Sequence, residues 1–162
     1  MMAIIGNRID GRLIHGQVAN LWATKLNIDR FVVIDDEVAQ SDIDKQALKL
    51  ATPAGIKLSV IPIEKAAQNI NNGKYGTQRL MVIAKRPDRF VALAEHGVQI
   101  DELNVGNMSQ TDETRQVTNS INITDEDIQD FETLHQQGVK IVAQMVPNDK
   151  AEDFMSLIKD KN

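Results

Sequence analysis

The stretch MAIIGNRIDGRLIHGQVANLWATKL, residues 2–26, organises the predicted fold of this chain. It opens with a short apolar run, residues 2–5, which predicts a first strand. From Val18 to Leu26 apolar side chains recur at spacings of three and four, as they do on one face of a helix. Residues 8–17 are therefore predicted to form the loop between a strand and a helix, where functional side chains are commonly mounted.

Apolar runs and helical patterns alternate along the rest of the chain. The further predicted strands are residues 30–35, 56–61, 80–84, 102–105, 117–123 and 139–146. The further predicted helices are residues 42–51, 62–70, 87–96, 125–137 and 150–159. Such repeated strand–helix units predict an α/β fold, with an open, mainly parallel sheet of about seven strands and helices on both faces.

Capping residues support several of these helix boundaries. Ser41 with Asp44, and Thr124 with Asp127, have the spacing of an N-cap and its third helical residue. Three helices end in a glycine followed by Ile or Val, and glycine adopts the left-handed conformation past a helix end without a Cβ penalty. These glycines are Gly55, Gly97 and Gly138. The helix over 42–51 carries one apolar face, made of Ile43, Ala47, Leu50 and Ala51.

Length and composition restrict the class of protein. A chain of 162 residues, 42% apolar and 25% charged, is expected to form a single domain over residues 1–162. Because cysteine is absent, disulfides and thiol catalysis are excluded. We find no signal peptide and no apolar run of the ~20 residues that span a bilayer, so we expect a cytoplasmic protein. A net charge of −5 without a basic block argues against a nucleic-acid partner.

The residue types in the first loop suit phosphoryl transfer. A neutral imidazole such as that of His15 is a nucleophile at physiological pH and can carry a phosphoryl group. Arg8 and Arg12 could stabilise the charge on the transferred oxygens. Asp10 could fix the tautomer of His15, and Gly16 could leave free amides at the positive end of the helix dipole.

Structural interpretations remain open at this point. An Arg–Asp–Arg cluster is commonly a solvated ion-pair network, and a lone histidine is commonly a helix cap or a packing residue. His96 and His135 lie in the last turns of predicted helices, where a cation favours the dipole. Residues 35–37, Asp-Asp-Glu, could hold a metal but fit a solvated strand end better. The glycines match neither a dinucleotide fingerprint nor a Walker loop.

Residues 8–18, RIDGRLIHGQV, resemble the signature of a known family. That family is the IIB component of the mannose/fructose/sorbose family of the bacterial phosphoenolpyruvate-dependent sugar phosphotransferase system (PTS). Within the family, this chain most resembles the mannose/glucose-type members. Residues 35–36, 104–108 and 138–147 resemble the family as well, so the resemblance covers nearly the whole chain. The family's fold is an open, mainly parallel α/β sheet.

The resemblance implies a phosphoryl relay. A IIA protein or domain phosphorylated on histidine would pass the group to His15, through Nδ1, and His15 would phosphorylate the sugar as it crosses the IIC/IID membrane pair. The family's other catalytic positions fall on Arg8, Asp10 and Arg12. Gly11 stands where many relatives have a second aspartate, so Asp10 is expected to orient His15 alone. The expected phosphate-binding positions are Gly11, Gly16, Asn104 and Gly106.

The resemblance also suggests partners and location. The expected sugar is mannose, glucose or a related hexose, and neither a cofactor nor a metal is implied. The chain would lie at the inner face of the membrane through its permease, as a separate subunit or as a domain of a IIA–IIB fusion. The sequence leaves a homodimer open. Two other classes compete with the relay: a binding module for a phosphorylated partner, and an enzyme that uses His15 as a general base.

Overall fold

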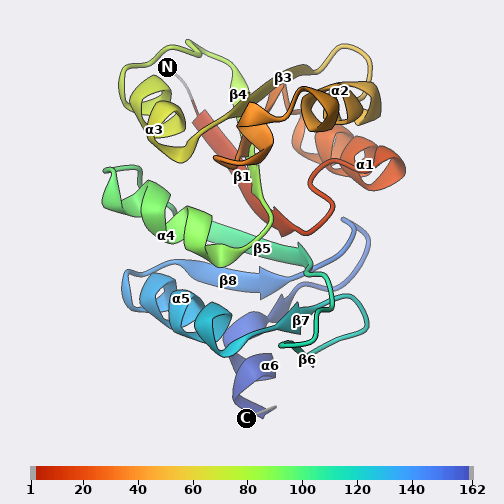
Figure 1. Ribbon diagram of the computed structural model, residues 1–162, viewed down its shortest axis with the longest axis vertical. Helices are drawn as coiled ribbons and strands as arrows, with labels where there is room; N and C mark the ends of the chain where they lie inside the picture. Colours follow the sequence, from red (N-terminus) through yellow and green to blue (C-terminus); the bar gives the residue numbers. More distant parts are fainter. Residues whose placement is uncertain (1–2, 161–162) are drawn as a thin grey trace.

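A seven-stranded sheet forms the centre of the computed structural model, which describes residues 3–160 (Figure 1). Its strands lie in the order β3-β2-β4-β1-β5-β8-β9, with parallel neighbours up to β8 and an antiparallel β9. The predicted open, mainly parallel sheet is therefore confirmed. The strands are β1 (Ala3–Asp10), β2 (Arg30–Ile34), β3 (Lys57–Ile61), β4 (Arg79–Ala84), β5 (Glu102–Asn107), β8 (Lys140–Ala143) and β9 (Glu152–Asp153).

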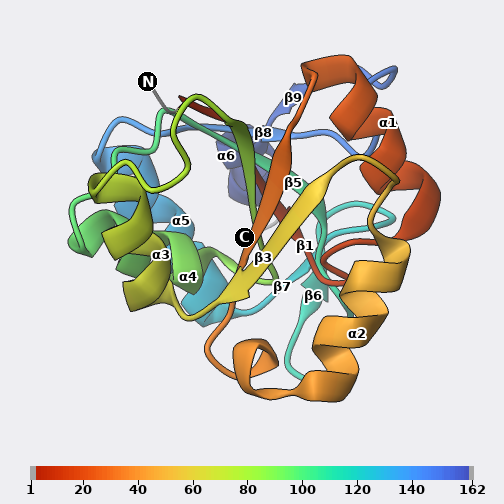
Figure 2. The same cartoon turned by 90° about the horizontal axis from the view of Figure 1, so that it is seen from above.

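Helices cover both faces of the sheet, as predicted. One face is covered by α1 and α2, and the other by α3, α4 and α5 (Figure 2). The short α6 packs against α5, where the rings of Phe154 and Phe131 lie 4.6 Å apart. The helices are α1 (Gly16–Leu26), α2 (Asp42–Ala51), α3 (Ile63–Asn71), α4 (Pro87–Glu95), α5 (Asp125–Gln136) and α6 (Phe154–Asp160), with a 3₁₀ turn η1 (Val38–Gln40) before α2.

The central strands are apolar on both sides because both faces of the sheet are covered. Along β2, Phe31 and Val33 enter the cluster beneath α1 and α2, while Val32 and Ile34 enter the cluster beneath α3, α4 and α5. Successive strand residues point to opposite faces, so a continuous apolar run supplies both clusters at once. Burying each of these side chains contributes roughly 1.5–3 kcal/mol.

The predicted helix boundaries rest on observed caps. Thr124 and Asp127 form a reciprocal capping box, and the side chain of Ser41 accepts the backbone N–H of Asp44. Gly55, Gly97 and Gly138 have φ angles of 87°, 90° and 92°, which is the left-handed conformation predicted for them.

The first strand is longer than predicted. It extends to Asp10, so Arg8 and Asp10 belong to β1 and the true loop is residues 11–15. Charged side chains suggested a loop, but in the fold these two pair with each other and are buried. Met2, in the predicted apolar start of this strand, lies outside the described residues.

Two further predictions are wrong in detail. Residues 117–123 do not join the main sheet, because the N–H of Val117 bonds to the carbonyl of Ile121 and closes a turn. The last two residues of the predicted strand form β7 (Asn122–Ile123), which pairs antiparallel with β6 (Arg115–Gln116) as a separate sheet. The last helix begins at Phe154 rather than near residue 150, because β9 precedes it and supplies the seventh strand of the sheet.

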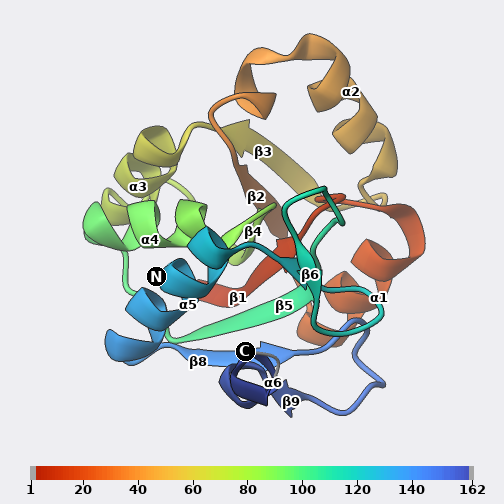
Figure 3. The same ribbon diagram turned by 60° about the horizontal axis from the view of Figure 1, so that its bottom comes forward.

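Of the apolar face predicted on α2, only Ala51 packs against the core. Ile43 is 83% exposed and Leu50 is 87% exposed, and Leu48 packs inward instead. A second, narrower apolar side, Leu48 and Ala51, therefore attaches α2 to the sheet. In Figure 3, α2 lies outside β3, with its far side away from the sheet.

Within residues 3–160 no helix has both the length and the apolar character needed to cross a membrane.

We predict that Asp130→Asn stabilises the protein near neutral pH. Burial raises the pKa of Asp130 to about 6, helped by the nearby carboxylates of Asp88, Asp127 and Glu126. A raised carboxyl pKa means that the folded state binds the proton more tightly than the unfolded state, so stability is lost as pH rises from about 4 through 6. Solvent screening limits the effect, and we expect Tm to rise by about 1–2 °C at pH 7.5. Thermal melts at pH 4 and pH 7.5 measure this, and an equal shift at both pH values would contradict the assignment.

Candidate functional site

The candidate site lies at the carboxyl edge of the sheet, where β1 ends and α1 begins. In open parallel sheets this edge is where ligands bind. The loop between the two elements is tight: the N–H of Leu13 bonds to the carbonyl of Asp10 at 2.9 Å, and Leu13 adopts a φ of 60°. A left-handed leucine is strained, and such strain is concentrated at functional sites. Both Leu13 and Ile14 are buried, so the loop is fixed to the core.

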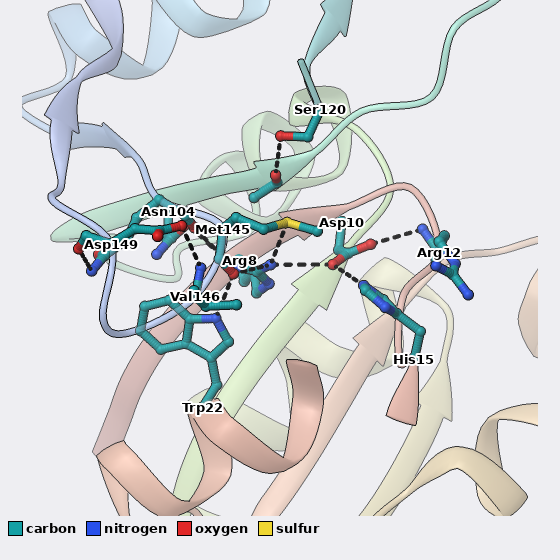
Figure 4. A network of polar contacts seen from close by, with 12 residues as sticks. Arg8, Asp10, Arg12, His15, Trp22, Asn104, Ser120, Met145, Val146 and Asp149 are labelled. Carbon is teal, nitrogen blue, oxygen red and sulfur yellow. Dashed lines mark hydrogen bonds and ion pairs between the residues drawn. The ribbon is translucent and has the colours of Figure 1, made fainter. Parts of the chain in front are cut away.

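Asp10 and His15 form the central contact of the site (Figure 4). The Nε2 atom of His15 lies 2.9 Å from Oδ2 of Asp10. An ionised carboxylate only accepts hydrogen bonds, so Nε2 carries the hydrogen and the lone pair resides on Nδ1. Among the described residues none is hydrogen-bonded to Nδ1, and the His15 side chain is 12% exposed. The arrangement leaves a nucleophilic nitrogen at the surface of the site.

Asp10 is fully buried and its carboxylate is satisfied on both oxygens. Oδ1 accepts the backbone N–H of Arg12 at 2.9 Å, and Oδ2 is shared by His15 and the guanidinium of Arg8, at 2.9 and 3.3 Å. A buried charge without such partners would be costly. The carboxylate therefore fixes both the imidazole and the path of the loop.

Arg8 is buried behind Asp10 rather than open to a ligand. Its guanidinium donates to Oδ1 of Asn104 at 3.3 Å and to the carbonyls of Gln144 and Met145 at 3.1 and 3.0 Å. It also lies over the ring of Trp22, whose indole N–H donates to the same Met145 carbonyl. Burial lowers the pKa of Arg8, and the charge of Asp10 opposes that effect. Arg8 thus joins β1, β5, α1 and the segment after β8.

Two of the glycines expected to bind phosphate are required by close packing. A Cβ on Gly106 would overlap the guanidinium of Arg8. A Cβ on Gly11 would lie 2.5 Å from Oγ of Ser109, so the segment after β5 lies directly on the loop.

The positive groups on the open side of the site are Arg12 and the start of α1. The side chain of Arg12 is exposed. His15 is the N-cap of α1 without a capping side-chain bond, and the first turn holds no acidic residue. The first amides of α1 are therefore free to bind an anion beside the imidazole. A hollow of about 270 Å³ adjoins Arg12, between the loop and α2, and Lys85 also lines it.

The structure thus divides the predicted site residues into two groups. Arg8, Asp10 and His15 are in direct contact, with Asn104 and Gly106 behind them, while Arg12 and Gly16 lie on the open side. Sequence reasoning missed the support of Arg8 by Trp22, Gln144 and Met145. Two of those three contacts go to backbone carbonyls, which carry no sequence signal. Residues 3–160 contain no group of three or more His, Cys, Asp or Glu placed to bind a metal.

Comparison with known proteins identifies the family. Residues 4–162 match the family described as PTS system sorbose subfamily IIB component. The chain is 35% identical over 160 residues to the fructose-specific EIIB component of Bacillus subtilis, covering 99% of this chain and 98% of that protein. It is 36% identical over 151 residues to the mannose-specific EIIAB component of Escherichia coli, covering 93% of this chain but 47% of that longer protein.

The fold agrees with the same family. The crystal structure of the IIBSor domain of the sorbose permease from Klebsiella pneumoniae superposes with a TM-score of 0.95 at 31% identity, covering 99% of both chains. This chain therefore belongs to the IIB components of the mannose/fructose/sorbose family of the PTS. Such components are phosphotransferases of sugar transport.

We predict that Gly106→Ala destabilises the fold through Arg8. The added methyl group must displace the buried guanidinium from Asp10, which we expect to cost about 2–4 kcal/mol in urea unfolding. In an Arg8→Met background the obstructing group is gone, so the same substitution should cost less than half as much.

Gly6→Ala in β1 is the matched control for this cycle. Its Cβ would meet only the flexible side chains of Leu26 and Met81, at 3.3 and 3.6 Å. We expect it to cost less than about 1 kcal/mol. An equal cost of Gly106→Ala in both backgrounds would show that Arg8 is not the residue it displaces.

Proposed function

We propose that His15 carries the phosphoryl group of this IIB component. The observation that supports this proposal is the bond from His15 Nε2 to the buried carboxylate of Asp10, which leaves Nδ1 unprotonated beside the free amides of α1. This is the arrangement that a phosphoryl acceptor requires: an oriented nucleophile next to a site that binds an anion.

The transfer is a displacement at phosphorus. Nδ1 of His15 forms an N–P bond while the N–P bond to the donor histidine of IIA breaks, and the donor imidazole leaves with its electron pair. Because donor and acceptor are both histidines, the exchange is close to isoenergetic. Catalysis then consists of positioning and charge stabilisation. In the second step a sugar hydroxyl displaces His15 from the phosphorus.

We assign the surrounding residues different roles in this step. Arg12, Gly16 and the first amides of α1 face the phosphoryl oxygens. Asp10 holds the tautomer and stabilises the positive charge that develops on the imidazole. Arg8 is a positioning residue, because both terminal nitrogens of its buried guanidinium donate to Asp10, Asn104 and the backbone after β8.

The proposed relay runs from a phosphorylated IIA protein or domain to a sugar that enters through the IIC/IID permease. The chain would act at the inner face of the membrane, held there by the permease. We propose mannose, glucose or a related hexose as the sugar. The relatives named for mannose and for fructose are 36% and 35% identical, so phosphorylation of each sugar with the cognate permease is the measurement that decides.

The proposal predicts a single phosphohistidine. After incubation with phosphoenolpyruvate, the general PTS proteins and a competent IIA, we expect a mass gain of one phosphoryl group that is acid-labile and base-stable. His15→Ala should abolish it. His96→Ala and His135→Ala are the matched controls and should keep it, because both residues lie exposed at the ends of α4 and α5. Absence of any gain with a competent IIA would leave a binding module or a general base as the role of His15.

A second prediction concerns Arg12. Arg12→Ala should slow phosphoryl transfer from IIA by roughly 10- to 100-fold, because one cation facing the phosphoryl oxygens is lost. Its Tm should stay within about 1–2 °C of the wild type, since an exposed charge contributes little to stability. Rapid-quench measurement of transfer and a thermal melt test the two parts. A large fall in Tm would show that Arg12 supports the fold instead. The proposed transfer uses no metal ion, so transfer that stops in excess chelator would contradict it.

A further inference from the structure

The hollow of about 270 Å³ between the loop and α2 has the lining of a small-molecule site. Among the described residues its charged side chains are those of Arg12, Lys85 and Asp44. The rest of the wall is glycine and apolar, with Ile14 from the loop and Leu48 from α2. A largely apolar wall with a few polar groups is typical of pockets that bind small ligands.

Lys85 is a cation of this hollow that the fold leaves without a partner. In the register of β1 and β4, Ala84 is level with Ile9. Lys85 comes next along the chain, so it lies beside Asp10 at the carboxyl edge of the sheet. Its side chain is half-buried, and within residues 3–160 no hydrogen bond or ion pair engages its ammonium group. A partly desolvated cation without a counter-ion favours binding of an anion.

Arg12 supplies the second cation. Asp10 accepts the backbone N–H of Arg12, while the exposed guanidinium makes no hydrogen bond or ion pair with the residues that the structure describes. Two free positive charges therefore line one hollow. A phosphate monoester carries about −1.5 to −2 charges at neutral pH, so its phosphate group matches this pair of cations.

Asp44 favours hydroxyl groups in the same ligand. It lies in the first turn of α2, and in the described part of the chain nothing donates to its carboxylate. An ionised carboxylate only accepts hydrogen bonds, so it attracts hydroxyl groups and repels a phosphate. The charged residues thus select a ligand with a phosphate at one end and hydroxyl groups at the other.

The size of the hollow limits the ligand further. Its volume of about 270 Å³ is just below the roughly 300–1,000 Å³ of most ligand pockets. A phosphorylated monosaccharide therefore suits it better than a nucleotide. The apolar side chains of Ile14 and Leu48 provide a surface for the C–H groups of the sugar ring.

We propose that this hollow binds a phosphorylated monosaccharide, with the phosphate on Arg12 and Lys85 and the hydroxyl groups on Asp44. The consequence for regulation rests on the proposed function, in which a hexose phosphate is the product and Arg12 faces the phosphoryl oxygens. Bound product occupies that arginine, so it competes with phosphoryl transfer from IIA. The relay therefore slows when the phosphorylated sugar accumulates.

Titration of the unphosphorylated protein with glucose 6-phosphate, followed by amide NMR, tests the site. We expect saturable shifts of the Gly11 and Ala47 amides, which line the hollow, with a Kd of about 1 mM. Inorganic phosphate should bind about fivefold more weakly because it lacks the hydroxyl groups. Glucose should give no saturable shift, because it lacks the phosphate.

Variants separate the two ends of the ligand. Lys85→Met should weaken glucose 6-phosphate binding by about tenfold, because one charge-assisted contact is lost, and Lys85→Arg should retain binding. Asp44→Ala should abolish the preference over inorganic phosphate, since it removes the hydroxyl acceptor and keeps both cations. Lys65→Met, which removes the same charge at an exposed position of α3 on the other face of the sheet, is the matched control and should bind like the wild type.

The rate of phosphoryl transfer from phosphorylated IIA tests the competition. Glucose 6-phosphate at a concentration equal to its Kd should reduce the wild-type rate by about half. The same concentration should reduce the rate of Lys85→Met by only about a tenth, relative to the uninhibited rate of that variant.

Four results would overturn the proposal. They are the absence of a saturable shift in the millimolar range, equal affinity for inorganic phosphate, wild-type affinity in Lys85→Met, and binding that leaves transfer unslowed. None of them bears on the role of His15, because the phosphohistidine is detected by mass without any sugar phosphate present.

Discussion

The buried carboxylate of Asp10 is the group on which this site depends. It binds His15, the backbone of Arg12 and the guanidinium of Arg8 at once, so it connects the imidazole, the loop and the sheet. A charge buried in this way is tolerated only while all its partners are present, and removing one partner typically costs about 3–5 kcal/mol. The same contacts that hold the imidazole in one tautomer therefore also hold the end of β1 in place.

Space for that ion pair comes from the neighbouring backbone. Arg8 fits because Gly106 of β5 has no side chain, and its donors end on carbonyls after β8. The site is thus supported by three adjacent strands and by Trp22 of α1. Rigid elements therefore surround the imidazole of His15, whose Nδ1 we propose as the reacting nitrogen.

The outer side of α2 carries large apolar side chains that do not pack on the sheet. Ile43 and Leu50 are exposed on this side, while Leu48, with Ala51, attaches the helix to the sheet. The helix therefore has two apolar sides, and only the side with Leu48 and Ala51 packs on the sheet. Ala47, between Ile43 and Leu50 on the outer side, lines the same hollow as Arg12, so this side borders the loop that carries His15.

The sequence by itself determined the alternation of strands and helices, the capping boxes, the left-handed glycines and the identity of the family, because these depend on short-range spacing or on a contiguous motif. It also singled out Arg8, Asp10 and His15 as candidates. Only the tertiary structure decided that Arg8 and Asp10 lie inside a strand, that Gly106 makes room for Arg8, and that residues 117–121 turn back instead of joining the sheet. Each of these depends on atoms far apart in sequence, among them backbone carbonyls that no side-chain pattern records.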